Sequence, residues 1–246
     1  MLNIDSWNLN HPKAVLDLLE AEEKLNEITD APAPDRNGLF KAKTVEKTLN
    51  ALVEHSLRTG PERLCAITNA QNAIQNRIES TVASNLDDYL EQARGSFDDA
   101  ANAYCASLEQ LPTEPFTAHD VINFSKEQRE AYDAAREAAG IISYWMNWSN
   151  DLRELPGHGM EHWTSWHLVA KPETVGALMV LQLDETAELD PAYRAILPTL
   201  AKAIREGAEL RLASPAQATA DAADVEAERQ EMAESAHRAL RTSLGY

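Results

Sequence analysis

The feature that most constrains the fold is the stretch of residues 62–111, which contains no proline and a single glycine, Gly95. Apolar side chains recur there about every 3.67 residues, which is the period of an α-helix and not of a strand. A left-handed coiled coil would show a period of about 3.5, so that architecture is disfavoured. The pattern predicts one helix over residues 61–111, about 75 Å long, with Gly95 as a hinge point, and therefore an elongated protein.

A second long helix is predicted over residues 125–155. Ser125 and Gln128 have the spacing of a capping box, in which each side chain bonds the backbone N–H of the other residue. Pro112 and Pro115 end the preceding helix, so residues 125–155 can fold back on it as an antiparallel hairpin. Glycine makes up only 9 of the 246 residues, and strong helix formers such as Ala, Leu and Glu are abundant. We therefore expect an all-α fold.

Proline, glycine and helix-capping residues divide the rest of the chain into shorter helices. The run 172–183 is apolar and fits either a helix or a strand. Pro156 and Gly157 end the hairpin, so we expect a first region over residues 1–155 and a C-terminal helical region over residues 156–246, as two domains or one continuous domain. The further predicted helices cover residues 13–28, 39–59, 117–124, 190–213 with a kink at Pro198, and 215–244.

The chain is acidic along its whole length. It carries 40 Asp and Glu against 22 Lys and Arg, which gives a net charge of −18, and no stretch of it is basic. Binding to nucleic-acid phosphates or to an anionic membrane surface needs clustered Lys and Arg, so neither partner is expected. The sequence begins without the pattern of a signal peptide, and no apolar run reaches the ~20 residues of a membrane span. We expect a cytoplasmic protein.

His158, Glu161 and His162 form the pattern His-x-x-Glu-His, which resembles the zinc-binding motif of the inverted zincins. The resemblance implies two histidines that hold zinc and a glutamate that activates water, and hence a metal-dependent hydrolase. That motif needs a helix, which Pro156 and Gly159 disfavour. We therefore expect a polar loop here, with no metal and no cofactor. A phosphate-binding glycine loop is also absent from the sequence, so enzymatic activity is disfavoured.

Large aromatic and apolar side chains provide the candidate interaction residues. Four of the five tryptophans lie within residues 145–166, where they either build a core beside the second long helix or form an exposed anchor patch. The last predicted helix has a thin apolar stripe, which is typical of a helix that faces solvent or binds a partner. A chain cut near Ser214 is expected to keep its fold and lose its partner. The candidate interaction residues are Trp145, Trp148, Trp163, Trp166, Met232, Leu240 and Leu244.

These observations leave three functional hypotheses. The favoured one is a non-enzymatic helical interaction or assembly protein, such as a structural or adaptor component of a phage or a bacterium, which binds a protein partner or a second copy of itself. The second is an acidic inhibitor that mimics DNA and blocks the basic nucleic-acid-binding surface of its partner. The third is the metal-dependent hydrolase that uses His158, Glu161 and His162.

Overall fold

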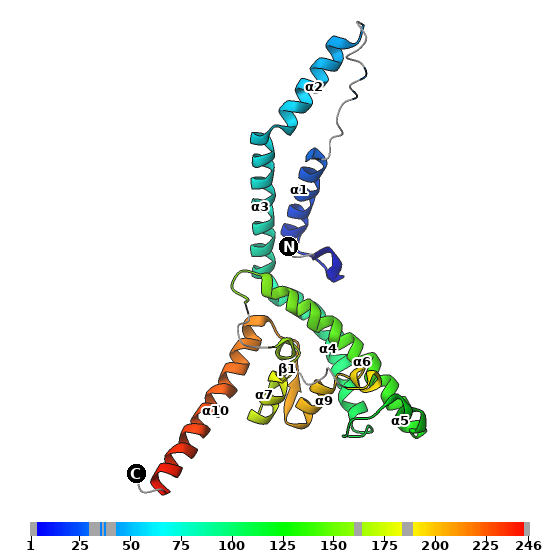
Figure 1. Cartoon of the computed structure of the whole chain (residues 1–246), viewed down its shortest axis with the longest axis vertical. Helices are drawn as coiled ribbons and strands as arrows, with labels where there is room; N and C mark the ends of the chain where they lie inside the picture. The colour runs from blue at the N-terminus through cyan, green and yellow to red at the C-terminus, as the bar shows by residue number, and fades with distance from the viewer. Residues whose placement is uncertain are drawn as a thin grey trace. The chain divides into compact units, whose positions relative to one another are not determined.

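The computed structural model describes residues 4–29, 35, 37, 43–159, 164–183 and 189–243, and in this part the chain is almost entirely α-helical (Figure 1). Among these residues, strands are confined to one two-stranded sheet. The all-α class expected from the sequence is therefore confirmed. Within the same residues, no helix combines the length and the apolar composition that a membrane span needs.

Two compact units make up the chain. Residues 11–85 form the first, and residues 2–10 together with residues 86–246 form the second. Each unit contains its own set of buried apolar side chains. The division at residue 155 suggested by the sequence stays a prediction.

The first unit contains α1 (Lys13–Thr29), α2 (Val45–Thr59) and α3 (Pro61–Ser84). α1 and α3 lie side by side and run in opposite directions (Figure 1). The Gln71 side-chain amide donates to Asn26 Oδ1 at 3.0 Å, which joins the two helices. The buried apolar side chains described in this unit are Val15, Ile67, Ile78 and Val82.

The long helix predicted over residues 61–111 is interrupted at Asn85, so α3 ends there and α4 (Leu86–Leu108) follows. Asn85 leaves helical geometry with φ −113° and ψ 19°, and its N–H bonds the Val82 carbonyl. Its side-chain amide donates to the Thr81 carbonyl at 2.7 Å. A short polar side chain that bonds the nearby backbone competes with the helical hydrogen bonds, which explains the break. The predicted hinge at Gly95 is wrong, because Gly95 lies inside α4.

α4 packs against α6 (Lys126–Asp151) as the predicted antiparallel hairpin, and the short helix α5 (Ala118–Asn123) lies in the connection (Figure 1). The predicted capping box is present, because the Ser125 hydroxyl accepts the Gln128 N–H and the Gln128 side chain accepts the Ser125 N–H. A 3₁₀ turn, η3 (Leu152–Glu154), continues α6 to the predicted end of the hairpin. The largest buried side chains of the two long helices are Tyr89, Phe97, Tyr104, Tyr132, Ile142, Trp145 and Trp148.

A small sheet follows the hairpin. β1 (Ala170–Pro172) comes after the 3₁₀ turn η4 (Ser165–Leu168) and pairs antiparallel with β2 (Ala208–Leu210). α7 (Val175–Gln182) starts soon after β1, where the Thr174 hydroxyl accepts a backbone N–H of its first turn. The apolar run that the sequence left open between helix and strand therefore contains the end of a strand and then a helix.

The single helix predicted over residues 190–213 is wrong. The structure divides this stretch into α8 (Pro191–Arg194), α9 (Pro198–Arg205) and β2. Leu197 has φ 52°, a left-handed backbone that cannot continue a right-handed helix. Gly207 has φ 97°, which glycine adopts without strain, and it turns the chain from α9 into β2.

Candidate functional site

The base of the C-terminal helix α10 (Pro215–Ser243) is built into the second unit. Ala218 and Ala222 are buried, and Ala218 packs with Leu168 and Ala213. The helix also lies against α7 and β1. A larger or charged side chain at a buried alanine displaces its neighbours, so the first two turns of α10 belong to the core.

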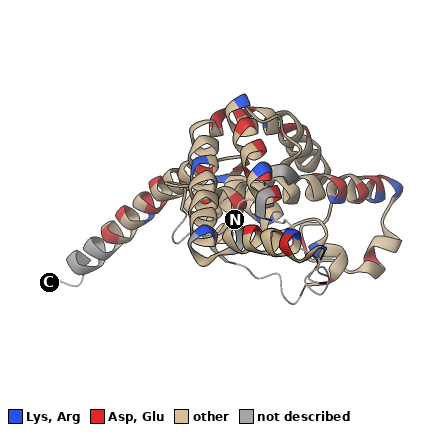
Figure 2. Cartoon of the chain, turned by 90° about the horizontal axis from the view of Figure 1, so that it is seen from above, with Lys and Arg blue, Asp and Glu red and all other residues tan. Residues whose placement is uncertain are grey.

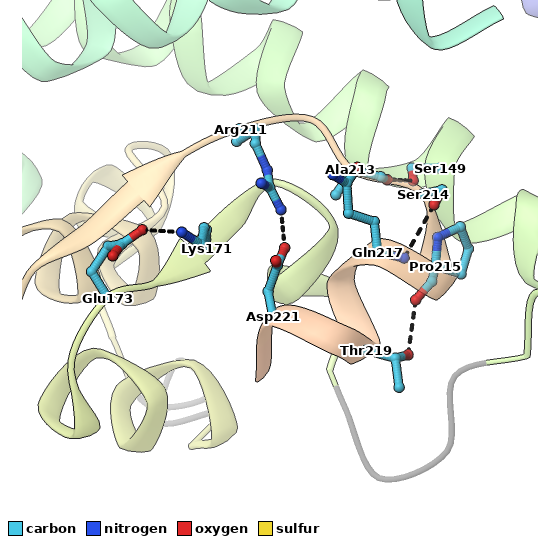
Figure 3. A network of polar contacts seen from close by, with 10 residues as sticks. All are labelled: Ser149, Lys171, Glu173, Arg211, Ala213, Ser214, Pro215, Gln217, Thr219 and Asp221. Carbon is cyan, nitrogen blue, oxygen red and sulfur yellow. Dashed lines mark hydrogen bonds and ion pairs between the residues drawn. The ribbon is translucent and has the colours of Figure 1, made fainter. Parts of the chain in front are cut away.

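Polar contacts hold the same turns in place (Figure 3). The Arg211 guanidinium forms an ion pair with the Asp221 carboxylate. The Ser149 hydroxyl of α6 donates to the Ala213 carbonyl at 2.7 Å. The Ser214 hydroxyl accepts a backbone N–H of the first turn of α10 at 3.2 Å, which caps the helix. α10 therefore starts from a base that is fixed by both packing and hydrogen bonds.

Beyond Glu226, α10 is exposed. Every side chain described over residues 227–236 is exposed, and Met232 shows 61% of its surface. Figure 1 shows this part of the helix extending away from α7 and β1. Leu240 and Leu244, which the sequence placed on the same stripe, lie outside the residues whose side chains the structure describes. We call residues 227–236 the outer part of α10.

The exposed stripe continues the buried one. Ala218, Ala222 and Val225 are separated by four and three residues, and Met232 and Ala236 follow after seven and four. At about 3.6 residues per turn, these five positions lie on one side of the helix. The side of α10 that packs against the unit is therefore the side that presents Met232 beyond it.

The outer part of α10 also carries exposed acidic side chains. Glu228, Glu231 and Glu234 are exposed on the outer part of α10. Arg229 forms an ion pair with Glu226 at 2.6 Å. The hydrogen bond from Arg229 lowers the pKa of the Glu226 carboxyl. The outer part of α10 thus combines an apolar stripe with an excess of negative charge.

Trp145 and Trp148 are buried inside the second unit. Trp7, at the end of the 3₁₀ turn η1 (Ile4–Trp7), packs edge-on against Trp148 and Tyr89, with ring centroids 5.6 and 5.4 Å apart. Trp145 meets Trp148 in the same geometry at 5.6 Å. Burial raises the pKa of Tyr89 to about 12. In the chain by itself, Trp145 and Trp148 therefore belong to a core and not to an exposed anchor patch. An interaction role for them stays a prediction.

The other members of the tryptophan group differ from these two. Trp166 is half-buried, and Trp163 lies outside the described residues. Sequence reasoning missed Trp7, because a contact between residues so far apart in the chain leaves no local pattern. The one sequence signal for its burial was a large apolar ring close to the first predicted helix.

Of the three predicted metal-site residues, the structure describes only His158. His158 is half-buried in the loop after α6, while Glu161 and His162 lie outside the described residues. In the part of the chain that the structure describes, no three His, Cys, Asp or Glu side chains are placed to hold a metal ion. His167 is buried, with Nδ1 at 3.2 Å from Thr164 Oγ1. Burial lowers the pKa of His167, which favours its neutral form.

A cleft of about 370 Å³ lies in the second unit, among the α4–α5 connection, α7, α8 and α9. Its charged lining residues are exposed, whereas the titratable groups of active sites are usually buried or otherwise perturbed. The Arg205 guanidinium donates to the Thr113 carbonyl at 3.1 Å, so it also holds the connection in place. The residues that line the cleft are Thr113, Glu114, Pro115, Val180, Leu183, Leu189, Tyr193, Pro198, Thr199, Lys202, Arg205 and Glu206.

No known family, curated protein or solved structure matches this chain. A functional inference therefore depends on the residues themselves, and the outer part of α10 is the candidate functional site.

Proposed function

We propose that this chain is a non-enzymatic interaction protein, a cytoplasmic structural or adaptor component of a phage or a bacterium, which binds a protein partner through the outer part of α10. The observation that carries the proposal is the change in burial along one helix face. Ala218 and Ala222 are enclosed by the unit, and Met232 lies on the same face beyond it, in solvent.

The energetics of a projecting helix support this proposal. An isolated helix shorter than about 12–15 residues is marginal in water, because its first turn is costly to form. The buried base of α10 provides that first turn, so the outer part can extend from it as a helix. A partner that covers Met232 would remove exposed apolar surface, at about 25 cal/mol per Å².

The charge of the outer part indicates the chemistry of the partner. Glu228, one turn before Met232 on the same side of the helix, would face a base beside an apolar groove that takes Met232 and Ala236. Many proteins bind an amphipathic helix in such a groove, with anchors spaced by three, four and seven residues. We infer a partner that has an apolar groove with a basic residue at one edge.

The acidic-inhibitor hypothesis remains the second candidate because of the exposed acids on α4. Five acids on this helix are exposed, and Arg94, its only base, pairs with one of them, Glu91, at 2.6 Å. Figure 2 shows acids on many helices with Lys and Arg between them, as solubility alone would require. Binding that weakens steeply with salt and is independent of Met232 would favour this hypothesis. The exposed acids of α4 are Asp87, Asp88, Glu91, Asp98 and Asp99.

Photo-crosslinking in cells tests the proposed function. A photoreactive phenylalanine replaces Met232 in one full-length variant and Ala227, on the opposite side of the helix, in a matched control. We expect a discrete protein adduct from position 232 that is absent or much weaker from position 227. Equal adducts from the two positions, or no adduct from position 232, would overturn the proposal.

A further inference from the structure

The helix α2 of the first unit carries an apolar stripe that is open to solvent. Val45, Leu49, Val53 and Leu57 follow at every fourth position, and they expose 39%, 53%, 51% and 72% of their surfaces. Residues four apart form a continuous ridge on a helix. An exposed ridge of four aliphatic side chains is a contiguous apolar patch, which is typical of an interaction surface.

The half-buried side of α2 does not include this ridge. Thr48, Ala51, Leu52 and His55 of α2 are half-buried, and they lie to one side of the ridge. In the part of the chain that the structure describes, Figure 1 shows no second helix alongside α2. Among its described residues the first unit buries few apolar side chains, so further burial at α2 would stabilise it.

The charge of this region distinguishes it from the rest of the chain. Residues 45–84 contain four acids and four bases, so the whole net charge of −18 belongs to the other residues. Two copies of an acidic protein repel each other over most surfaces, but a neutral apolar surface avoids that cost. A basic or an acidic partner would gain nothing here. The charged residues are Glu46, Lys47, Glu54, Arg58, Glu62, Arg63, Arg77 and Glu79.

We propose that the occupant of this ridge is the α2 helix of a second copy of this chain. An i, i+4 ridge fits between the corresponding ridges of an identical helix, at a crossing angle of about −50°. A two-fold pairing uses the same surface on both copies, so it is closed and stops at a dimer. This pairing does not involve the outer part of α10. An experiment can therefore contradict either proposal without contradicting the other.

Sedimentation velocity on the full-length protein tests the dimer, at low salt and in about 1 M NaCl, where surface charge is screened. We expect a dimer that persists at high salt, because its contact is apolar. The variants Leu49→Asp and Leu57→Asp should raise the dissociation constant of the dimer by about 100-fold or more. Matched controls, Ile122→Asp in α5 and Met232→Asp in α10, replace other exposed apolar side chains and should leave it unchanged.

A second measurement covers the case in which a charged variant fails to fold. A photoreactive phenylalanine at Leu49 should give a covalent dimer in otherwise unaltered protein, and the same group at Lys47, on the opposite side of α2 from Leu49, should not. A monomer at about 100 μM, a dimer that both Asp variants leave intact, or equal crosslinking from the two positions would overturn the proposal.

Discussion

Arg211 and Asp221 form an ion pair that joins the residue after β2 to the second turn of α10. Together with the buried Ala218 and Ala222, this pair marks how far the helix belongs to the fold. The sequence suggested a cut near Ser214 that would spare the fold. In the structure, the turns of α10 up to Glu226 are packed against the unit. A cut that spares the fold must therefore lie beyond Glu226.

Truncation distinguishes the two parts of α10. A chain that ends at Glu226 should keep the free energy of unfolding of the full chain within about 0.5 kcal/mol, because every side chain described beyond Glu226 is exposed. A chain that ends at Ser214 should lose about 2 kcal/mol or more, because it exposes the surface under Ala218 and Ala222 and leaves Arg211 without Asp221. Urea denaturation followed by circular dichroism measures both.

Other outcomes of the truncation experiment would contradict this division of α10. Equal stability of the two shortened chains would mean that the base of α10 is not part of the core. A large loss on removal of residues after Glu226 alone would mean that the outer part of α10 is packed against the unit.

The tryptophan cluster should carry much of the stability of the second unit. Trp7→Ala removes a buried ring that contacts both Tyr89 and Trp148, so we expect a loss of about 3–5 kcal/mol. The matched control is Trp166→Ala, which removes a half-buried ring and should cost clearly less. Chemical denaturation measures the two losses, and equal losses would contradict the central place of Trp7.

His167 should make stability depend on pH. Burial lowers its pKa below the ordinary value of 6.5, so the unfolded chain binds a proton more readily than the folded chain does. The stabilisation by neutral His167 is fully present above pH 6.5 and is lost as the pH falls from there towards the lowered pKa.

The measurement is the free energy of unfolding between pH 8 and pH 5, for the full chain and for His167→Gln, at equal ionic strength. The variant should show a smaller loss over this range than the parent. Parallel curves would contradict the assignment, and a direct titration of the His167 ring by NMR in the parent protein checks it without a substitution.

The sequence allowed much of the helical architecture to be predicted, because the period of apolar residues is a local signal. The hairpin of α4 and α6 and the cap at Ser125 followed from such signals. The break at Asn85 did not, because polar side chains that bond the nearby backbone are common within helices as well. The left-handed backbone of Leu197 could not be predicted either, because a positive φ is uncommon for leucine and the sequence carries no signal for it.

The candidate site could be predicted only in part. Exposure of Met232 agrees with the thin stripe that the sequence shows. The buried positions Ala218 and Ala222 were not identified, because alanine suits a helix surface and a tight helix contact equally well. For the ridge of α2 the sequence shows only an apolar helix face, since periodicity shows which residues share a face but not what covers it.

The most direct test of the central claim is the affinity of the crosslinked partner, once purified, for four forms of this protein, measured by calorimetry. These are the full chain, the chain ending at Glu226, Met232→Asp and Ala227→Asp. We expect the shortened chain and Met232→Asp to bind at least about 100-fold more weakly, while Ala227→Asp stays within about threefold of the parent. Unchanged binding by the shortened chain would contradict it.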